Sequence, residues 1–290
     1  MKTKIVAALM LVTIMSLSLV AIAQSQLQEN SKGGFNVRAS EVSKVKPSKP
    51  SPGGISTGIV SELPEGANRW AVIIGISDYA GIKTDLEYCD DDAREFYNVL
   101  TVTYGWSAEN IRLLIDEQAT KDNILTAIAW LKNNEKAGDE VVFFYSGHGS
   151  VSNYDVDGDG ERKDECIIPY ECQAAYFIWD GELEQLFADI DSDRIMFYFD
   201  SCYSGGMTDL AGPGRLICMA CGENQLSMES SAWQNGQFTY YFVDQGMQDA
   251  LADKNGDGQV TFEEAFDFAK ANCLRQKPTA SDGFADDMPP

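Results

Sequence analysis

The chain has 290 residues and a formal net charge of −23 at pH 7, with 45 acidic residues against 22 basic ones. A field of this sign repels nucleic acid and attracts metal ions or basic peptides, so the composition argues against a nucleic-acid-binding protein. Acidity that only keeps a protein soluble is the alternative, and the placement of particular acids has to decide between the two.

The first 23 residues have the pattern of a signal peptide. Lys2 and Lys4 precede an apolar stretch over residues 5–20, and residues 21–23, Ala-Ile-Ala, match a small-x-small cleavage site. We therefore expect a secreted protein with no stable membrane span after signal cleavage, because no later stretch is long and apolar enough to cross a bilayer. Residues 24–66 are rich in Ser, Pro, Gly and Lys, and we expect a flexible linker or pro-segment there.

Residues 67–276 are predicted to form a single α/β domain, followed by a polar, frayed tail over 277–290. Apolar strands alternate with amphipathic helices, which is typical of a mostly parallel sheet with helices on both faces. In chain order we expect strands over 69–76, 110–115, 140–145, 166–169, 194–199 and 215–221, and helices beginning near residues 90, 120, 179, 238 and 262.

Two of these strands end in reactive side chains. One is followed by Ser146-Gly-His-Gly149, which contains the only histidine of the chain, and the other by Asp200-Ser-Cys-Tyr-Ser-Gly-Gly206. A cysteine nucleophile needs a nearby base and donors for an oxyanion, and the glycines allow main-chain N–H groups to approach a substrate closely. Either residue alone is commonly structural. Together, at the ends of two strands, they favour a catalytic pair of His148 and Cys202.

These two motifs, 54 positions apart from His148 to Cys202, resemble those of the caspase-like cysteine peptidases, where the spacing is about 50 residues. The Gln-Ala-Cys signature of true caspases is replaced by Asp-Ser-Cys, as in the metacaspase-like prokaryotic branch of the peptidase C14 family of clan CD. The resemblance implies a caspase-like three-layer sandwich with a mostly parallel central sheet. It also implies a cysteine-type endopeptidase.

The same resemblance implies a role for each site residue. Cys202 would attack the scissile carbonyl, His148 would protonate the leaving amine, and the backbone N–H groups of Gly149 and Cys202 would hold the oxyanion. Metacaspase-like enzymes cleave after Arg or Lys by means of two acids that correspond to Asp200 and Asp92. The chain departs from the family in having Asp91 where the motif has Asn. An acid near residue 92 also has an ordinary role in favouring the start of a helix.

A loop over residues 253–264 has the complete pattern of a calcium-binding EF-hand loop. It has oxygen-bearing side chains at the ligand positions and glycine at position 6. We expect calcium there in a structural role. The side-chain ligands would be Asp253, Asn255, Asp257, Gln259 and Glu264.

A second acidic loop begins at Asp155 and matches only the first half of that pattern, because Cys166 stands where glutamate is required. Its candidate ligands are Asp155, Asp157, Asp159 and Asp164. The resemblance implies a calcium-activating site in this region, and a plain charged loop is the alternative.

The seven cysteines form an odd number, so reserving Cys202 for catalysis leaves six that could pair in an oxidising compartment. Cys218-x-x-Cys221 is compatible with a redox or metal pair. No histidine or further cysteine cluster completes a zinc site, which favours ordinary buried cysteines.

The resulting expectation is a secreted, calcium-dependent cysteine endopeptidase that cleaves after Arg or Lys. It would be able to trim its own N-terminal segment, which contains Arg38, Lys44, Lys46 and Lys49. The alternative is a non-catalytic, calcium-binding extracellular module on the same scaffold. A thiol nucleophile is vulnerable to oxidation outside the cell, which adds weight to that alternative.

Overall fold

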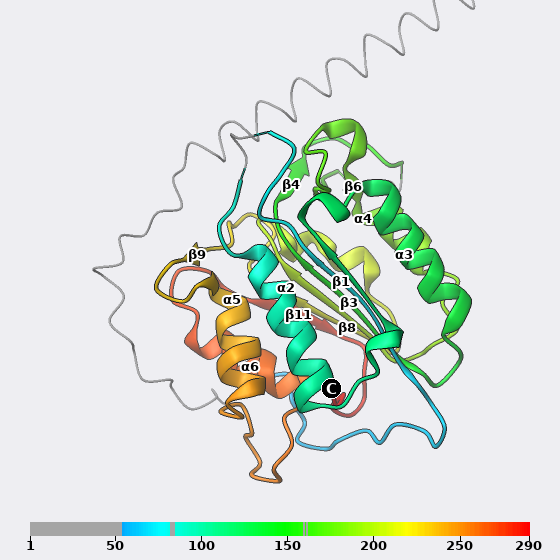
Figure 1. Ribbon diagram of the computed structural model, residues 1–290, viewed down its shortest axis with the longest axis vertical. Coiled ribbons are helices and arrows are strands. Elements are labelled where there is room, and N and C mark those ends of the chain that lie inside the picture. The colour runs from blue at the N-terminus through cyan, green and yellow to red at the C-terminus, as the bar shows by residue number, and fades with distance from the viewer. Residues whose placement is uncertain (1–53, 82–84, 159, 161) are drawn as a thin grey trace, which may run out of the picture.

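The computed structural model describes residues 54–81, 85–158, 160 and 162–290 (Figure 1). The predicted signal peptide and most of the predicted linker lie outside these residues. A six-stranded sheet with the order β11-β8-β7-β3-β1-β2 forms the centre of the molecule. Its strands in chain order are β1 (Arg69–Gly75), β2 (Ile111–Ile115), β3 (Glu140–Ser146), β7 (Ile195–Asp200), β8 (Arg215–Met219) and β11 (Thr279–Asp282).

All neighbours in this sheet run parallel except β11, which pairs antiparallel with β8. The central strands β3 and β7 are buried along their whole length. This burial explains their continuous apolar sequences, since a parallel strand covered on both faces has no solvent side to alternate with. The predicted mostly parallel sheet with helices on both faces is confirmed.

Helices cover both faces of the sheet (Figure 1). The α-helices are α2 (Cys89–Asn98), α3 (Lys121–Asn134), α4 (Asp180–Phe187), α5 (Gln237–Thr239) and α6 (Phe262–Asn272). The π-helices are η2 (Val99–Thr103) and η7 (Tyr240–Gln248), and the short 3₁₀ turns are η3 (Ala108–Asn110), η4 (Asp116–Gln118), η5 (Ala174–Tyr176) and η6 (Ser204–Leu210). The pair α3 and α4 packs on one face, and α2, η7 and α6 pack on the other.

Successive side chains of each strand point alternately into two hydrophobic cores, one on each face of the sheet. Phe144 and Tyr198 point toward α2 and α5, whereas Phe143 and Phe197 point toward α4. The Phe144 and Tyr198 rings stack with centroids 4.5 Å apart, and Tyr198 stacks on Phe238 of α5 at 4.9 Å. This aromatic stack fixes α5 against the end of β7, beside the reactive cysteine.

The helix starts follow from local sequence. The Thr120 hydroxyl accepts the N–H of Asn123 at 3.2 Å and caps α3. Thr261 and Glu264 form a reciprocal capping box at the start of α6. These caps place the beginning of both helices where the sequence pattern expects them.

Two small sheets lie outside the central one. The first joins β4 (Gly149–Ser152), β5 (Asp164–Ile167) and β6 (Ile178–Trp179), and it presents the second acidic loop beyond the histidine. The second joins β9 (Glu229–Ser230) and β10 (Asn235–Gly236). In the sequence the first small sheet follows β3 and the second follows β8, and both contribute to the site described below.

The two ends of the predicted domain need correction. Residues 277–290 are not a frayed tail, because β11 pairs with β8 and the side chain of Asp287 is completely buried. The last part of the predicted linker, from Ile55 to Ser61, also packs on the domain. The Asp287 carboxylate accepts hydrogen bonds from Ser56, Thr57 and Gly58, and this network joins the two segments. The polar composition of these two segments gives no sign that they pack on the domain, because their polar groups form hydrogen bonds with each other.

The helix predicted over 238–251 is present but differs in kind. It begins as α5 and continues as the π-helix η7, which ends at Gln248. Within the described residues, no helix combines the length and the apolar character that crossing a membrane requires.

Candidate active site

Strands β3 and β7 lie in register and bring His148 and Cys202 to the same edge of the sheet. Ser146, the last residue of β3, pairs with Asp200, the last residue of β7. Just beyond this pair, the N–H of Gly147 donates to the Asp200 carbonyl at 3.2 Å. His148 and Cys202 each follow two residues after the pair, and both line one pocket. The two motifs found in the sequence therefore form one site.

Two tyrosines hold the backbone of His148 on both sides. The Tyr79 hydroxyl oxygen accepts the His148 N–H at 2.7 Å, and the Tyr145 hydroxyl donates to the His148 carbonyl at 2.6 Å. The ring of Tyr79 also lies against the imidazole, with centroids 4.8 Å apart and planes inclined by 35°. Burial raises the pKa of both phenols, so both stay neutral, and Tyr145 keeps the hydrogen atom that it donates to the His148 carbonyl.

The loops that contain the histidine and the cysteine touch at Gly149. A Cβ at this position would lie 2.1 Å from the carbonyl oxygen of Cys202, so any side chain would force the loops apart. Directly after the cysteine, Tyr203 adopts a left-handed backbone with φ of 62°, and its N–H donates to the Gln225 carbonyl at 2.8 Å. The two predicted oxyanion donors, the N–H groups of Gly149 and Cys202, thus belong to segments in contact.

Asp200 is buried beside the cysteine and is surrounded by neutral donors. Its Oδ2 accepts the Thr239 N–H at 3.1 Å and the Thr239 hydroxyl at 2.9 Å, and its Oδ1 accepts the Ser227 hydroxyl. The Tyr198 and Thr239 hydroxyls lie 3.0 Å apart, which ties this arrangement to the aromatic stack. Asp200 is therefore fixed in one orientation.

Asp92 reaches the same pocket from the first turn of α2. It is completely buried, and its oxygens accept the Ser146 hydroxyl at 2.6 Å and the Gly236 N–H at 3.0 Å. A Cβ on Gly236 would lie 2.4 Å from Asp200 Oδ2 and 3.0 Å from Asp92 Oδ2. The two predicted specificity acids, 108 positions apart in the sequence, therefore converge on one point of the pocket wall.

No lysine or arginine is among the described residues that line this pocket. Burial raises the pKa of Asp92 well above its usual value, and the nearby charge of Asp200 raises it further. Burial also raises the pKa of Asp200, against the hydrogen bonds from Ser227 and Thr239. Buried carboxylates without a cation are costly, so the pocket suits a ligand that brings positive charge.

The thiol of Cys202 opens into this pocket but is closely surrounded by protein. Burial raises its pKa to about 12, and the neighbouring Cys221, Asp200 and Glu229 contribute in the same direction. The resting cysteine is therefore a neutral thiol rather than a thiolate. Activation needs a change in this electrostatic environment or direct proton transfer to His148.

The segment that contains His148 and Cys202 is also the part of the chain that is similar to known proteins. Residues 69–211, which include His148 and Cys202, match the family model described as the metacaspase, peptidase C14 domain. This segment is a caspase-like peptidase C14 domain. The family that it matches is one of cysteine peptidases.

Curated relatives of the C14 domain are metacaspases of fungi and plants. Metacaspase-1 of Kluyveromyces lactis is 36% identical over 151 residues, covering 49% of this chain and 34% of the relative. Metacaspase-4 of Arabidopsis thaliana is 38% identical over 148 residues, again covering 49% of this chain and 34% of the relative. The chain thus spans about a third of the length of these relatives.

Solved structures support the fold of the C14 domain. The crystal structure of protein GSU0716 from Geobacter sulfurreducens superposes with a TM-score of 0.55, at 20% sequence identity. The match covers 74% of this chain and 92% of that protein. It extends the common fold well beyond the segment matched by the family model.

Sequence reasoning missed one wall of the pocket in the C14 domain. Residues 227–236, between β8 and α5, contribute Ser227, Met228, Glu229 and Gly236 to the lining. They contain no recognisable motif and lie outside the range of the family model. Only the folded chain brings them against Asp200.

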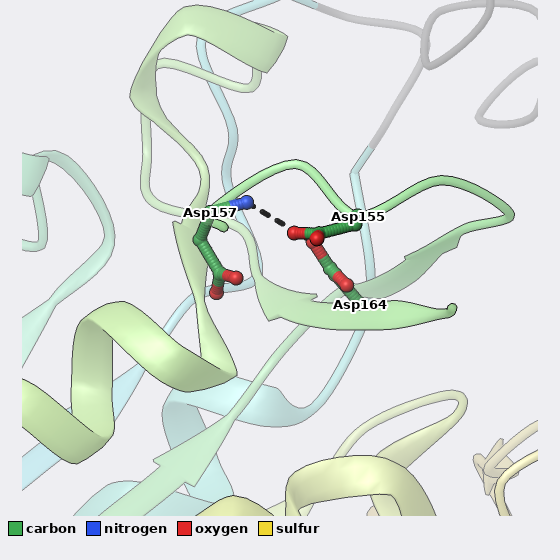
Figure 2. Close-up of side chains that lie close together, drawn as sticks. All are labelled: Asp155, Asp157 and Asp164. Atoms are coloured by element: carbon green, nitrogen blue, oxygen red, sulfur yellow. Dashed lines mark hydrogen bonds between the residues drawn. The ribbon is translucent and has the colours of Figure 1, made fainter. Parts of the chain in front are cut away.

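The acids of the second acidic loop gather into one cluster (Figure 2). Ligand oxygens of Asp155, Asp157 and Asp164 all lie within 4.8 Å of one another, the only such group in the described part of the chain. Asp164 is completely buried, and its Oδ2 accepts the backbone N–H of Asp157 at 3.1 Å. Asp159, the fourth candidate ligand, lies outside the described residues.

Further acids surround this cluster and connect it to the cysteine. Asp157 Oδ2 accepts the N–H of Gly181 at 3.1 Å, at the start of α4, next to the buried Asp180. Burial raises the pKa of Asp180 to about 8. The Glu165 carboxylate fills the space in front of Gly206, since a Cβ there would lie 2.1 Å from Glu165 Oε2. The acidic loop therefore contacts the turn that follows Cys202.

The loop over residues 253–264 lies at a separate place, between η7 and α6. The Asp253 carboxylate accepts the N–H groups of Gly256 at 2.6 Å and Gly258 at 3.0 Å. Glu264 reaches back from α6 to accept the Lys254 N–H at 3.2 Å. Asp253 and Glu264 thus both hydrogen-bond to the backbone of this loop, and its calcium binding stays a prediction.

The remaining cysteines are not organised as a disulfide framework. The structure joins none of the described cysteines in a disulfide, although the sequence left six available for pairing. Cys218 is buried in β8, and Cys221 is buried near the reactive turn, where its Sγ contacts the Ser201 carbonyl at 3.4 Å. Both are packed in the core, as expected for ordinary buried cysteines.

Proposed function

We propose that this protein is a secreted cysteine endopeptidase that cleaves peptide bonds after Arg or Lys by means of Cys202 and His148. The observation that carries the proposal is the shared pocket, in which a thiol and an imidazole lie beside two buried carboxylates with no basic side chain among the described lining residues. Export follows from the signal-like residues 1–23, which lie outside the described residues.

The chemistry proceeds in two steps. His148 takes the proton from Cys202 Sγ as the sulfur forms a bond to the scissile carbonyl carbon, and the N–H groups of Gly149 and Cys202 hold the oxyanion. His148 then gives its proton to the leaving amine as the C–N bond breaks. Water, deprotonated by His148, then attacks the thioester carbonyl carbon, the C–S bond breaks to release the carboxylic acid product, and His148 returns the proton to the Cys202 sulfur. The tyrosines on either side of His148 keep the imidazole in place throughout.

The basic specificity has an electrostatic origin. A guanidinium or ammonium in the pocket would offset the burial of Asp92 and Asp200, whereas an aspartate side chain would add a third negative charge. A panel of peptides that differ only in the residue before the cleaved bond tests this. Cleavage after Arg and Lys is expected, and a preference for Asp would contradict the proposal.

We propose that the cluster of Asp155, Asp157 and Asp164 binds calcium and that this activates the enzyme. Three carboxylates with oxygens this close are the donor set that calcium prefers, and Glu165 connects them to the turn after Cys202. When bound, calcium would supply charge compensation that orders this loop. Replacing Asp155 and Asp157 together by Asn should remove activation by calcium and weaken calcium binding measured by calorimetry.

The loop over 253–264 provides the matched comparison. We propose that calcium there stabilises the C-terminal helices without taking part in activation. Glu264→Gln should reduce the calcium-dependent rise in melting temperature and leave the calcium-dependent gain in activity unchanged. Full activity of the wild type in excess chelator would leave both loops with only a structural role.

A non-catalytic calcium-binding module is the second candidate, favoured by the high pKa of the Cys202 thiol. A covalent probe with an arginine-like side chain and a thiol-reactive group separates the two. The enzyme should be labelled at Cys202, and labelling should fall strongly in His148→Ala. Labelling that is equal in the two proteins would favour the non-catalytic module.

The N-terminal segment offers a natural substrate. Arg38, Lys44, Lys46 and Lys49 precede the docked residues 55–61, so self-cleavage at any of them would leave the docked part in place. Purified Cys202→Ala protein should keep this segment. Trimming of that variant in a pure preparation would argue against autoprocessing.

A further inference from the structure

Glu229 is a third acid in the active-site pocket. It begins β9, in the wall that has no sequence motif, and it lines the pocket together with Asp92, Asp200 and Cys202. Its charge acts on Asp92 and on Cys202, raising the pKa of both. The pocket therefore presents three carboxylates rather than the two identified from the sequence.

The contacts of Glu229 aim its carboxylate at the loop before α2. Its Oε1 accepts the Glu87 N–H at 3.1 Å, and its Oε2 accepts the N–H groups of Glu87 at 3.2 Å and Tyr88 at 3.1 Å. These donors are neutral, like those of Asp92 and Asp200. Each acid is thus oriented by neutral groups, and no basic side chain among the described pocket residues compensates its charge.

We propose that Glu229 is a specificity-determining residue that contributes directly to binding the cationic side chain of the substrate. This inference rests on the proposed cleavage after basic residues. An arginine side chain has five N–H donors in a rigid planar fork, so it can engage carboxylates on more than one side. Asp92 and Asp200 converge at Gly236, which is next to β9 in the small sheet. Glu229 and Gly236 are paired residues of that sheet, so the third acid lies beside the convergence point of the other two.

A purely structural role for Glu229 is the competing explanation, because the same carboxylate ties β9 to the start of α2. The two explanations differ in what they require. A structural tie needs hydrogen-bond acceptors, and glutamine keeps one of the two: a carbonyl oxygen in the place of Oε2 can still accept the N–H groups of Glu87 and Tyr88, whereas the contact of Oε1 is lost. Binding a cation needs the charge, which glutamine lacks.

The pH dependence gives an independent signature. Burial raises the pKa of Glu229 to about 7, with Glu87 and Asp200 adding to the rise. Above this pH the carboxylate is charged, so the affinity for a cation should increase as pH rises from 6 to 8. The titratable groups that face this region are Glu87, Tyr88, Cys89, Asp92, His148, Asp200 and Cys202.

The test compares Glu229→Gln with Glu229→Asp, which keeps the charge, and with Glu109→Gln, which removes one exposed acid far from the pocket. Two quantities are measured from pH 6 to 8: KM and kcat for a peptide cleaved after Arg, and the inhibition constant of agmatine, a small guanidinium compound. Agmatine binding involves no chemistry at Cys202, so it separates Glu229 from the titration of His148.

We expect Glu229→Gln to raise KM and the agmatine inhibition constant by about five- to tenfold at pH 8, with kcat within a factor of two. The pH dependence of agmatine binding near 7 should flatten. Glu229→Asp should recover most of the affinity, and Glu109→Gln should match the wild type.

Agmatine affinity equal to the wild type in Glu229→Gln would overturn the proposal. Equal losses of agmatine affinity in the Gln and Asp variants, together with a lower kcat, would also overturn the proposal and would indicate a purely structural role for Glu229. Wild-type enzyme in the same assay must cleave after Arg. If the wild type failed to do so, the basic specificity itself would be refuted. That result differs from a Glu229 variant whose agmatine affinity is unchanged, which refutes only the role of Glu229.

Discussion

Buried carboxylates at the two ends of the central sheet have opposite surroundings. At the amino end, Glu140 of β3 is completely buried and meets two arginines, with Arg69 Nε at 3.5 Å and Arg194 at 3.4 Å. At the carboxyl end, Asp92 and Asp200 are equally buried but meet only neutral donors. Burial raises the pKa of Glu140 to about 7 even though both arginines lower it, so the fold itself compensates this charge in part. The second offers no basic side chain among the described pocket residues, and this difference supports the proposal that its acids bind a cationic ligand.

Asp200→Asn should have the largest effect on activity. The pocket loses a fixed charge that faces the substrate cation, so kcat/KM for a peptide cleaved after Arg should fall by at least about 100-fold. Steady-state kinetics with Arg and neutral peptides measures this. A proportionate loss on both peptides would contradict a specificity role for Asp200.

The same variant should not lose stability. Because the folded-state pKa of Asp200 is raised, the folded protein binds a proton more tightly than the unfolded chain, and stability falls as pH rises above the unfolded value of about 3.9. Asp200→Asn removes this cost. Its melting temperature relative to the wild type should therefore be higher at pH 7, above the unfolded pKa, than at pH 3, below it, and a large drop at pH 7 would assign Asp200 to the structure.

Glu140→Gln should behave in the opposite way. Removing one partner of a buried ion pair leaves arginine charge uncompensated, and the expected loss is about 3 kcal/mol of the free energy of unfolding, or roughly 10 °C in Tm. The values of kcat and KM below the transition should be unchanged. Thermal unfolding and steady-state kinetics of one preparation measure stability and activity together. Altered cleavage specificity in this variant would contradict the distinction between the acids at the two ends of the sheet.

The pocket acids should also restrain the nucleophile. Burial is the largest cause of the raised pKa of the Cys202 thiol, and Asp200 and Glu229 add to it, so a cation that fills the pocket should lower that pKa. Agmatine should increase the rate at which iodoacetamide alkylates Cys202 at pH 7, by about threefold. Simple protection of the thiol by agmatine would contradict this electrostatic link.

Tyr79→Phe should have a modest effect on activity. The variant keeps the ring against His148 but loses the oxygen that accepts the His148 N–H. We expect kcat to fall by about fivefold with KM unchanged, because the imidazole is less well positioned. Tyr176→Phe, at an exposed position, is the control. A change in KM alone would contradict a positioning role.

The sequence predicted those parts of the molecule that depend on local patterns. The apolar strands ending at Ser146 and Asp200 predicted a parallel sheet, and the reactive side chains that follow them predicted one shared site. Asp92 came only from the family resemblance, since nothing local distinguishes it from an acid that favours the start of α2.

The rest could not be predicted, because it depends on contacts between distant segments. Glu229 reaches the pocket only through a turn with no motif, and the docking of residues 55–61 on Asp287 joins two polar segments more than 200 positions apart. In both cases the polar composition suggests a loop. The hydrogen bonds that hold these segments in place are made to each other or to backbone N–H groups, and no local pattern predicts them. The raised pKa of Cys202 likewise follows from packing and not from sequence.

The most direct test of the central claim is cleavage of a matched peptide series with Arg, Lys, Gln or Asp before the scissile bond, in calcium, by the wild type and by Cys202→Ala and His148→Ala. The account predicts cleavage after Arg and Lys by the wild type alone. Cleavage after Asp, or activity that survives loss of the thiol, would contradict it.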